Sequence, residues 1–267
     1  MSIAFSKYAG CGNDFILIDN RVSIFPENHP SLIQKLCRRA LGIGADGVIL
    51  LENSSHSDFK MRIFNADGQE AEMCGNGIRC LMKFIHSLGH TQKSYRIETF
   101  LRPLLVQLCG DQVSVEMGSP LDIRWNIPLT IEGIDYVVHY LDTGVPHVIL
   151  FTENVQTFDL NFWGPKFRYH PAFSPKGTNF NVVQVGEDGT LWNRTYERGV
   201  EAETLACGTG CVAAALAAHH ILGLRSPIQV RTRSEESLTV AFTDLFDSIV
   251  MTGPATQIFS GHFEVSP

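Results

Sequence analysis

A four-residue phrase occurs twice in this chain and constrains its fold more than any other feature. Cys74-Gly75-Asn76-Gly77 returns as Cys207-Gly208-Thr209-Gly210, 133 residues later (207 minus 74), which is about half of the 267 residues. Each copy opens an Ala-, Leu- and Ile-rich stretch that is typical of a helix. Two thiols in matching places, each at a glycine-rich helix N-terminus, indicate two related halves that share one site at a two-fold interface.

The composition excludes several classes of protein. Hydrophobic residues make up 44% of the chain, enough for a substantial core, and the net charge of −7 argues against a nucleic-acid partner. No apolar run approaches the ~18 residues of a membrane span, and the first residues lack the pattern of a signal peptide. Because seven cysteines is an odd number and no secretory signal precedes them, we expect a cytoplasmic protein with reduced thiols and no membrane partner.

The chain is predicted to contain many short strands and few helices, a mixed α/β (α+β) fold. The turn-forming residues Gly118-Ser119-Pro120 favour a domain boundary there, so that the halves are 1–118 and 119–255. Apolar periodicity and turn residues predict helices at 30–41, 76–88 and 211–222, and strands at 15–18, 48–51, 59–64, 104–108, 113–117, 136–141, 148–151, 181–185, 191–196, 228–232, 238–242 and 249–252.

The two halves follow a similar order of elements. Asn65, nine residues before Cys74, is predicted to correspond to Arg198, nine residues before Cys207. The stretch 212–218 is apolar on all sides, which predicts a helix buried all round inside a curled sheet. That stretch therefore positions the helix N-terminus and has no chemical role of its own.

Thiols at helix N-termini favour acid–base chemistry. The helix dipole and unpaired N–H groups lower a thiol pKa from its free value of about 8.5, so we expect lowered pKa values for Cys74 and Cys207. The same N–H groups favour a carboxylate ligand. One thiolate would take a proton from a carbon while the opposite thiol returns one to the other face, which inverts the stereochemistry.

Plainer interpretations stand beside this one. A single cysteine phrase is commonly part of a core, and the spacings 74–80 and 207–211 are unlike those of a structural zinc ribbon. A disulfide between Cys74 and Cys207 would silence both bases. A lone His147 is more often structural. The adjacent Glu197 and Arg198 point to opposite faces of a strand, so at most one of them faces the site, and a solvated surface pair is the plainer interpretation.

Four longer motifs together resemble the diaminopimelate epimerase family, and the match runs from end to end. They are the stretches 10–15 (GCGNDF), 42–47 (GIGADG), 64–80 (FNADG leading to MCGNGIRC) and 196–210 (YERG leading to ETLACGTG). The resemblance implies two pseudo-symmetric domains, each a curled sheet around a central helix, with the site in the cleft between them. It also implies that 256–267 returns to the first domain as an added strand.

The resemblance further implies an isomerase without pyridoxal phosphate, other cofactor or metal. It would interconvert LL- and meso-diaminopimelate for lysine and peptidoglycan synthesis, with a homodimer left open. Cys74 and Cys207 would be the acid/base pair, with His147 and Glu197 in support. The reacting carboxylate would lie on Gly75, Asn76, Gly208 and Thr209, and the rest of the substrate on Asn13, Asn65, Asn179, Glu197 and Arg198.

Two departures from the family pattern affect specificity. Val145 stands before Pro146-His147 where the family usually has Asn, and it cannot hydrogen-bond the distal end of a substrate. This loss predicts tolerance of amino acids with a simpler distal end, such as glutamate. The stretch 199–204 is one residue longer than usual, which affects the placing of Glu197 and Arg198.

Three other functions remain open at this point. A proline-racemase-type enzyme shares the paired cysteines but normally has His where this chain has Asn76. A PhzF-like isomerase shares the architecture without the thiol pair. A non-enzymatic dithiol or metal-binding protein is the third alternative.

Overall fold

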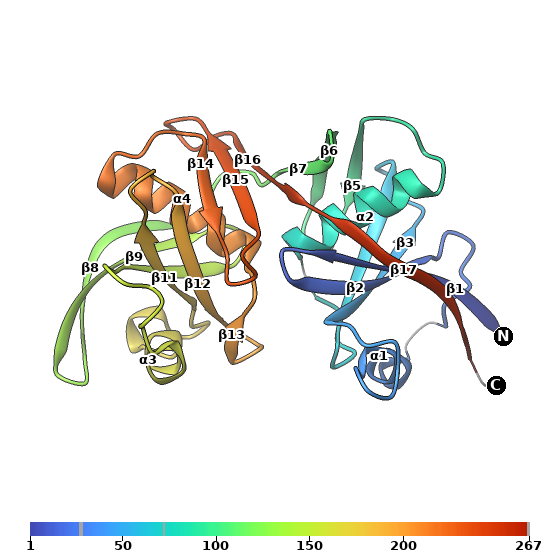
Figure 1. Cartoon of the computed structure of the whole chain (residues 1–267), viewed down its shortest axis with the longest axis horizontal. Coiled ribbons are helices and arrows are strands. Elements are labelled where there is room, and N and C mark those ends of the chain that lie inside the picture. The colour runs from blue at the N-terminus through green and yellow to red at the C-terminus, as the bar shows by residue number, and fades with distance from the viewer. Residues whose placement is uncertain (27–28, 72, 266–267) are drawn as a thin grey trace. The chain divides into compact units, whose positions relative to one another are not determined.

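The chain folds into two compact units in a computed structural model that describes residues 1–26, 29–71 and 73–265. The first unit comprises Met1–Glu116 and the segment from Gly253 onward, and the second comprises Met117–Thr252 (Figure 1). Residues 266 and 267 of the predicted returning strand lie outside the described residues.

The first unit is a mixed sheet with two helices. The strands follow the order β17-β1-β2-β3-β4-β5-β6-β7, in which β2–β3 and β4–β5 are parallel pairs and the others antiparallel. Its elements are β1 (Ser2–Gly10), β2 (Asn13–Asp19), α1 (Pro30–Cys37), β3 (Gly47–Glu52), β4 (Phe59–Asn65), α2 (Gly75–Ser87), β5 (Ser94–Glu98), β6 (Pro103–Cys109), β7 (Gln112–Glu116) and β17 (Thr256–Glu264).

The second unit repeats this topology. Its strands follow the order β8-β9-β10-β11-β12-β14-β15-β16, with β13 beside β12, and the parallel pairs are again the two that a helix connects, β10–β11 and β12–β14. Its elements are β8 (Ile123–Ile131), β9 (Ile134–Asp142), β10 (Pro146–Phe151), α3 (Leu160–Arg168), η1 (Pro171–Phe173), β11 (Asn179–Val185), β12 (Leu191–Glu197), β13 (Ala202–Thr204), α4 (Gly208–Leu222), β14 (Ile228–Arg231), β15 (Ser237–Phe242) and β16 (Ile249–Pro254).

One strand has a different origin in the two units. In the second unit, β8 directly precedes β9 in the chain and pairs with it antiparallel. In the first unit, the equivalent place beside β1 is filled by β17, from the far end of the chain, whose residues pair from Thr256 to Glu264 with β1. The C-terminal strand therefore completes the unit that contains the N-terminus.

The strand registers relate the two units residue by residue. Gly47 of β3 lies opposite both Phe15 of β2 and Asn65 of β4. In the second unit, Asn179 of β11 lies opposite His147 of β10. Equivalent strand positions are therefore 132 residues apart (147 minus 15, 179 minus 47), one fewer than the separation of the cysteine phrases.

This offset corrects one predicted correspondence. Asn65 ends β4 and Glu197 ends β12, and they are 132 residues apart (197 minus 65). Asn65 therefore corresponds to Glu197 and not to Arg198, so the earlier assignment was wrong. The additional residue lies between Glu197 and Cys207, in the segment that contains β13.

Each sheet curls around one central helix. Helix α2 packs against β1, β2, β6, β7 and β17, whereas α4 packs against β10, β12, β14 and β15. Every residue from Ala213 to Ala218 in α4 has 0% exposure, which confirms the prediction of a helix buried all round. Small side chains allow the strands to approach such a helix on every side.

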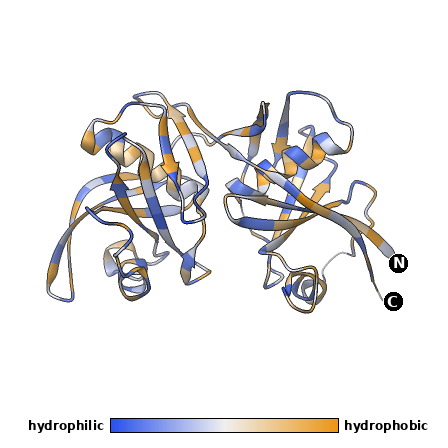
Figure 2. Ribbon diagram, viewed as in Figure 1, coloured by the Kyte–Doolittle hydropathy of each residue, from blue (hydrophilic) through white to orange (hydrophobic). Residues whose placement is uncertain are grey.

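The parallel strands next to each central helix are covered on both faces. Val48 and Leu50 of β3 pack with Ile33 of α1 in one cluster. Ile49, between them, points the other way and approaches Gly77 of α2. This double burial explains why such strands appear in the sequence as continuous apolar runs, whereas Figure 2 shows hydrophobic and hydrophilic colours alternating along other strands.

Several element predictions differ from the structure. The helix expected at 30–41 ends at Cys37, because Arg38 is extended and the N–H of Gly42 closes a turn onto the Arg38 carbonyl. Helix α3 was not predicted, since Gly164 and Pro165 interrupt its pattern. Its N-terminus is nevertheless capped by the side chain of Asp159. Strands β1, β5, β8 and β13 were also missed.

The helices in the described ranges include none that is long and apolar enough to cross a membrane.

The two glycines at the first turns of the central helices provide a matched stability test. A Cβ on Gly77 would lie 2.9 Å from Ile49 Cδ1, the movable end of a side chain, whereas a Cβ on Gly210 would collide with Asn181 Oδ1 and lie 3.2 Å from His147 Cε1. We expect Gly77→Ala to change the free energy of unfolding by less than about 1 kcal/mol, because helix propensity offsets the small shift. Gly210→Ala should destabilise by about 1–3 kcal/mol in urea unfolding. Equal effects would contradict this comparison.

Candidate active site

Cys74 occupies the N-cap of α2. Its backbone is extended (φ −142°, ψ 112°), and its Sγ accepts the backbone N–H of Gly77 at 3.3 Å. The side chain is half-buried, whereas Gly75 and Asn76 behind it are buried. The thiol and the first N–H groups of the helix therefore meet at one point, as the sequence predicts.

Asn76 and Asn13 are held in defined amide orientations. The Asn76 Oδ1 accepts from Arg79 Nη2 at 2.9 Å, and its Nδ2 donates to Asn13 Oδ1 at 2.6 Å. Asn13 Nδ2 in turn donates to Asp46 Oδ2 at 3.0 Å. Both amide orientations are thus fixed, and each side chain keeps an N–H donor that it can offer a ligand.

An ion cluster that runs from the buried Lys7 to the exposed Arg39 adjoins Asn13. Asp14 pairs with Lys7 at 2.8 Å and with Arg39 at 2.8 Å, and Arg39 also reaches Asp46 at 2.7 Å. Burial alone would raise the pKa of Asp14, but the hydrogen bonds and charges of Arg39 and Lys7 hold it below its ordinary value. The ion pair with Arg39 holds the Asp46 carboxylate in place as the acceptor for Asn13.

Asn65 lies at the exposed end of β4, where its backbone N–H bonds the Gln69 carbonyl.

Cys207 occupies the N-cap of α4 with the same extended backbone (φ −127°, ψ 107°). It is more buried than Cys74, with 9% exposure, and its Sγ lies 3.5 Å from Thr209 Oγ1. Burial, and next the negative charge of Glu197, raise the pKa of Cys207 well above its ordinary value. The expected lowering of this pKa is therefore wrong for the structure as it stands, because the helix terminus contributes less than desolvation costs.

His147 is wholly buried beside the first turn of α4. Its Nε2 lies 2.9 Å from Thr209 Oγ1, and its Nδ1 lies 3.0 Å from Asn181 Nδ2. Burial, assisted by the charge of Arg198, lowers the pKa of His147 to about 3. The imidazole is therefore neutral at physiological pH.

The remaining predicted residues gather at the ends of β11 and β12. Asn179 donates to the Pro146 carbonyl at 2.9 Å and accepts the backbone N–H of Arg198 at 2.8 Å. Glu197 accepts from Thr204 Oγ1 at 2.6 Å, and the half-buried Arg198 guanidinium lies 3.5 Å from the Lys176 carbonyl. Asn179 thus fixes the backbone that carries Arg198.

The structure brings the predicted residues together in two sets. In the first unit, the side chains of Asn13 and Asn76 are hydrogen-bonded to each other near Cys74. Gly75 lies between Cys74 and Asn76 in the chain, and Asn65 lies at the end of β4. In the second, His147 and Thr209 are linked to Cys207 and Gly208, and Glu197, Asn179 and Arg198 adjoin them.

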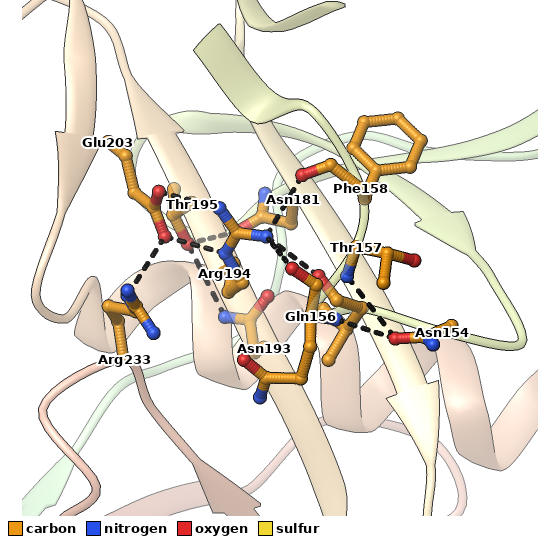
Figure 3. A network of polar contacts seen from close by, with 11 residues as sticks. Asn154, Gln156, Thr157, Phe158, Asn181, Asn193, Arg194, Thr195, Glu203 and Arg233 are labelled. Atoms are coloured by element: carbon orange, nitrogen blue, oxygen red, sulfur yellow. Dashed lines mark hydrogen bonds and ion pairs between the residues drawn. The ribbon is translucent and has the colours of Figure 1, made fainter.

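Sequence reasoning missed the side chains that support these residues. Arg79 and Asp46 orient the asparagines of the first unit. In the second unit, Asn181 is hydrogen-bonded to His147, and Thr195 is hydrogen-bonded to Asn181 (Figure 3 shows Asn181 and Thr195). Polar residues at buried positions of apolar strands were the available signal. Within the ranges described, no three His, Cys, Asp or Glu side chains are grouped to hold a metal ion.

The fold is shared with a class of epimerases, racemases and isomerases. A solved PhzF-family phenazine biosynthesis protein of Bacillus anthracis superposes with a TM-score of 0.78 at 15% identity, covering 99% of this chain and 100% of that one. A probable proline racemase of Agrobacterium radiobacter has a TM-score of 0.74 at 15% identity, covering 99% and 94%. At such identities these likenesses define the fold.

Sequence comparison identifies the family within that class. The diaminopimelate epimerase family model matches residues 5–122 and 139–258. A diaminopimelate epimerase of Chlorobaculum tepidum is 40% identical over 257 residues, covering 95% of this chain and 98% of the relative. One of Synechocystis is 41% identical over 283 residues, covering 99% and 100%. The chain belongs to the diaminopimelate epimerase family.

The buried His147 makes stability depend on pH. Because its pKa is about 3 in the folded protein and 6.5 in the reference state, the unfolded chain binds the proton first as pH falls. The stabilisation is complete above pH 6.5 and is lost progressively toward pH 3. Between pH 8 and pH 5 we expect this group alone to lower the free energy of unfolding by about 2 kcal/mol.

Urea unfolding of the wild-type protein and of His147→Gln at both pH values measures this contribution. The wild-type protein should lose about 2 kcal/mol more than the variant. The same pH dependence in both proteins would show that His147 is protonated normally in the folded state.

Proposed function

We propose that this protein is a cofactor-independent epimerase that interconverts LL- and meso-diaminopimelate by two-base proton transfer between Cys74 and Cys207. The observation that carries the proposal is the family match along nearly the whole chain, combined with a cysteine at the N-cap of each central helix. The halves expected from the sequence, 1–118 with 256–267 and 119–255, would each contribute one thiol. The mechanism requires both sulfurs to reach opposite faces of one α-carbon.

The chemical step balances without a redox partner. The thiolate of one cysteine takes the α-proton, and the C–H bonding pair passes into the carbanion and its carboxylate. The thiol of the other cysteine then delivers a proton to the opposite face. The burial that raises the pKa of Cys207 keeps it in the protonated form, which is the form that donates.

The helix N-termini are suited to hold the reacting carboxylate. Gly75, Asn76, Gly208 and Thr209 stand where the first N–H groups of α2 and α4 have no intrahelical acceptor. These donors would stabilise the negative charge that develops on the carboxylate in the transition state. Because the Asn76 amide is oriented by Arg79, its remaining N–H is available for the same purpose.

The other end of the substrate would lie on the polar groups near β4, β11 and β12. In this proposal Arg198 pairs with the distal carboxylate, and Asn13, Asn65 and Asn179 supply hydrogen bonds. Glu197 would meet the substrate ammonium group, and His147 would support the thiol. A cytoplasmic location and a homodimer belong to the same proposal, and light scattering on the purified protein measures the latter.

The α-proton exchange of diaminopimelate in deuterium oxide tests the activity. Reduced protein without added cofactor should exchange and epimerise LL-diaminopimelate, as followed by NMR. Cys74→Ala and Cys207→Ala should each lower epimerisation by at least about 100-fold, because each removes one of the two proton-transfer groups. Cys109→Ala, at an exposed thiol outside the site, is the control and should retain activity.

A Cys74→Ala variant that keeps its epimerase activity would contradict the two-thiol mechanism. Absence of exchange in the wild-type protein, with metal bound to reduced thiols, would favour a dithiol or metal-binding protein instead.

Val145 makes a separate prediction about specificity. Its half-buried side chain precedes Pro146 and lacks any hydrogen-bonding group. We expect the wild-type protein to exchange the α-proton of L-glutamate as well as that of diaminopimelate, and Val145→Asn to lower the ratio of glutamate to diaminopimelate exchange by about 10-fold. Val145→Ala controls for size. If diaminopimelate exchanges and glutamate does not, this substitution has not broadened the substrate range.

A further inference from the structure

The sheet side chains beneath the first turns of the two central helices differ in polarity. Beneath the first turn of α2, Gly77 contacts the apolar ends of Ile49 and Ile63. The positions 132 residues further along are Asn181 and Thr195, and there Gly210 of α4 contacts Asn181 and His147 instead. Burying polar side chains beneath an otherwise apolar helix costs desolvation free energy. Such side chains therefore call for a role that an apolar residue could not fill.

The backbone fixes the orientation of the Asn181 amide. Its Nδ2 lies 3.1 Å from the carbonyl oxygen of Val148, which can only accept, and 3.0 Å from His147 Nδ1. Its Oδ1 accepts from Thr195 Oγ1 at 2.8 Å (Figure 3). Exchanging nitrogen and oxygen would set two acceptors against each other at Val148, so both amide protons are donated, one of them to His147 Nδ1.

The direction of the next two hydrogen bonds follows from this one. A neutral imidazole whose Nδ1 accepts carries its proton on Nε2. Nε2–H therefore donates to Thr209 Oγ1 at 2.9 Å. Having accepted there, the Thr209 hydroxyl is free to donate its own proton, and Cys207 Sγ lies 3.5 Å away.

We infer that Asn181, braced by Thr195, is a positioning residue that fixes the Nε2–H tautomer of His147 and thereby makes Thr209 a hydrogen-bond donor to Cys207 Sγ. The opposite tautomer would turn the Thr209 proton toward His147 and present an oxygen lone pair to the sulfur. A donor favours the thiolate of Cys207, whereas a lone pair favours the thiol. The inference rests on the proposed acid–base role of Cys207.

The same hydrogen-bond directions exclude one role for His147, that of proton acceptor for Cys207. Its Nε2 already holds a proton and its Nδ1 is engaged by Asn181, so it does not receive the Cys207 proton through Thr209. The other ionisable groups that influence these two side chains are Glu197 and Cys211, at Cys207, and Arg198, at His147. Glu197 is on β12 and Cys211 on α4.

The first measurement is the tautomer of His147 in the wild-type protein, by NMR of ¹⁵N-labelled histidine. The signal assigned through loss in His147→Gln should show a protonated Nε2 and an unprotonated Nδ1 at pH 7. A protonated Nδ1 would overturn the inference without any variant of Asn181.

The second measurement is the pH dependence of Cys207 alkylation by iodoacetamide, resolved by peptide mass spectrometry in a Cys74→Ala, Cys109→Ser background. We expect Asn181→Leu to shift the midpoint upward by about one pH unit, because the released imidazole no longer commits Thr209 as a donor. Thr209→Val should give a shift at least as large, and Asn181→Leu should add nothing in that background. An undiminished second shift would show that Asn181 acts on Cys207 by another route.

Matched variants separate this role from packing. Thr195→Val should shift the midpoint in the same direction, and Thr195→Ser should restore it. Ile49→Leu, at the position of the first unit that corresponds to Asn181, should leave the midpoint unchanged. If Asn181→Leu does not fold, the comparison of Thr195→Val with Thr195→Ser tests the inference instead. Equal alkylation midpoints for these two variants would overturn the bracing role of Thr195. Neither readout requires substrate, so the inference can hold while epimerisation fails, or fail while epimerisation holds.

Discussion

The close approach between each central helix and its sheet is the constraint on which the rest of the structure depends. Gly77 and Gly210 stand one turn into α2 and α4, where a Cβ would meet a side chain of the sheet below. Because the helices enter the sheets this closely, their first N–H groups emerge beside the strand ends. A cysteine at each N-cap, Cys74 or Cys207, is thereby placed next to backbone donors and the polar residues at those strand ends.

The repeated fold supports unequal chemistry in its two copies. Asn76 and Thr209 occupy equivalent places, yet Asn76 is oriented by a buried arginine and a neighbouring asparagine, whereas Thr209 is bonded to a neutral histidine. Burial raises the pKa of Cys207 because removing a thiolate from water costs more than a helix terminus returns. In the proposed mechanism, the two cysteines that alternate as acid and base thus start from different environments.

Fold likeness and family membership answer different questions about this protein. PhzF-family proteins and a probable proline racemase share the architecture at about 15% identity, so the architecture alone is compatible with several reactions. Identity of about 40% along nearly the whole chain is what assigns the family. Within it, we expect Val145 to change the groups that this chain offers a substrate.

The amino-acid sequence by itself determined the paired cysteine phrases, the duplicated order of strands and the buried character of 212–218, because each follows from local pattern or repetition. Only the tertiary structure decided that Asn65 corresponds to Glu197, since strand register depends on pairing between distant segments. It also decided the helix at α3, whose Gly164-Pro165 pattern is overridden by packing. The protonation of Cys207 came from the structure as well, because burial depth and hydrogen-bond direction are properties of neighbours that the chain brings together only on folding.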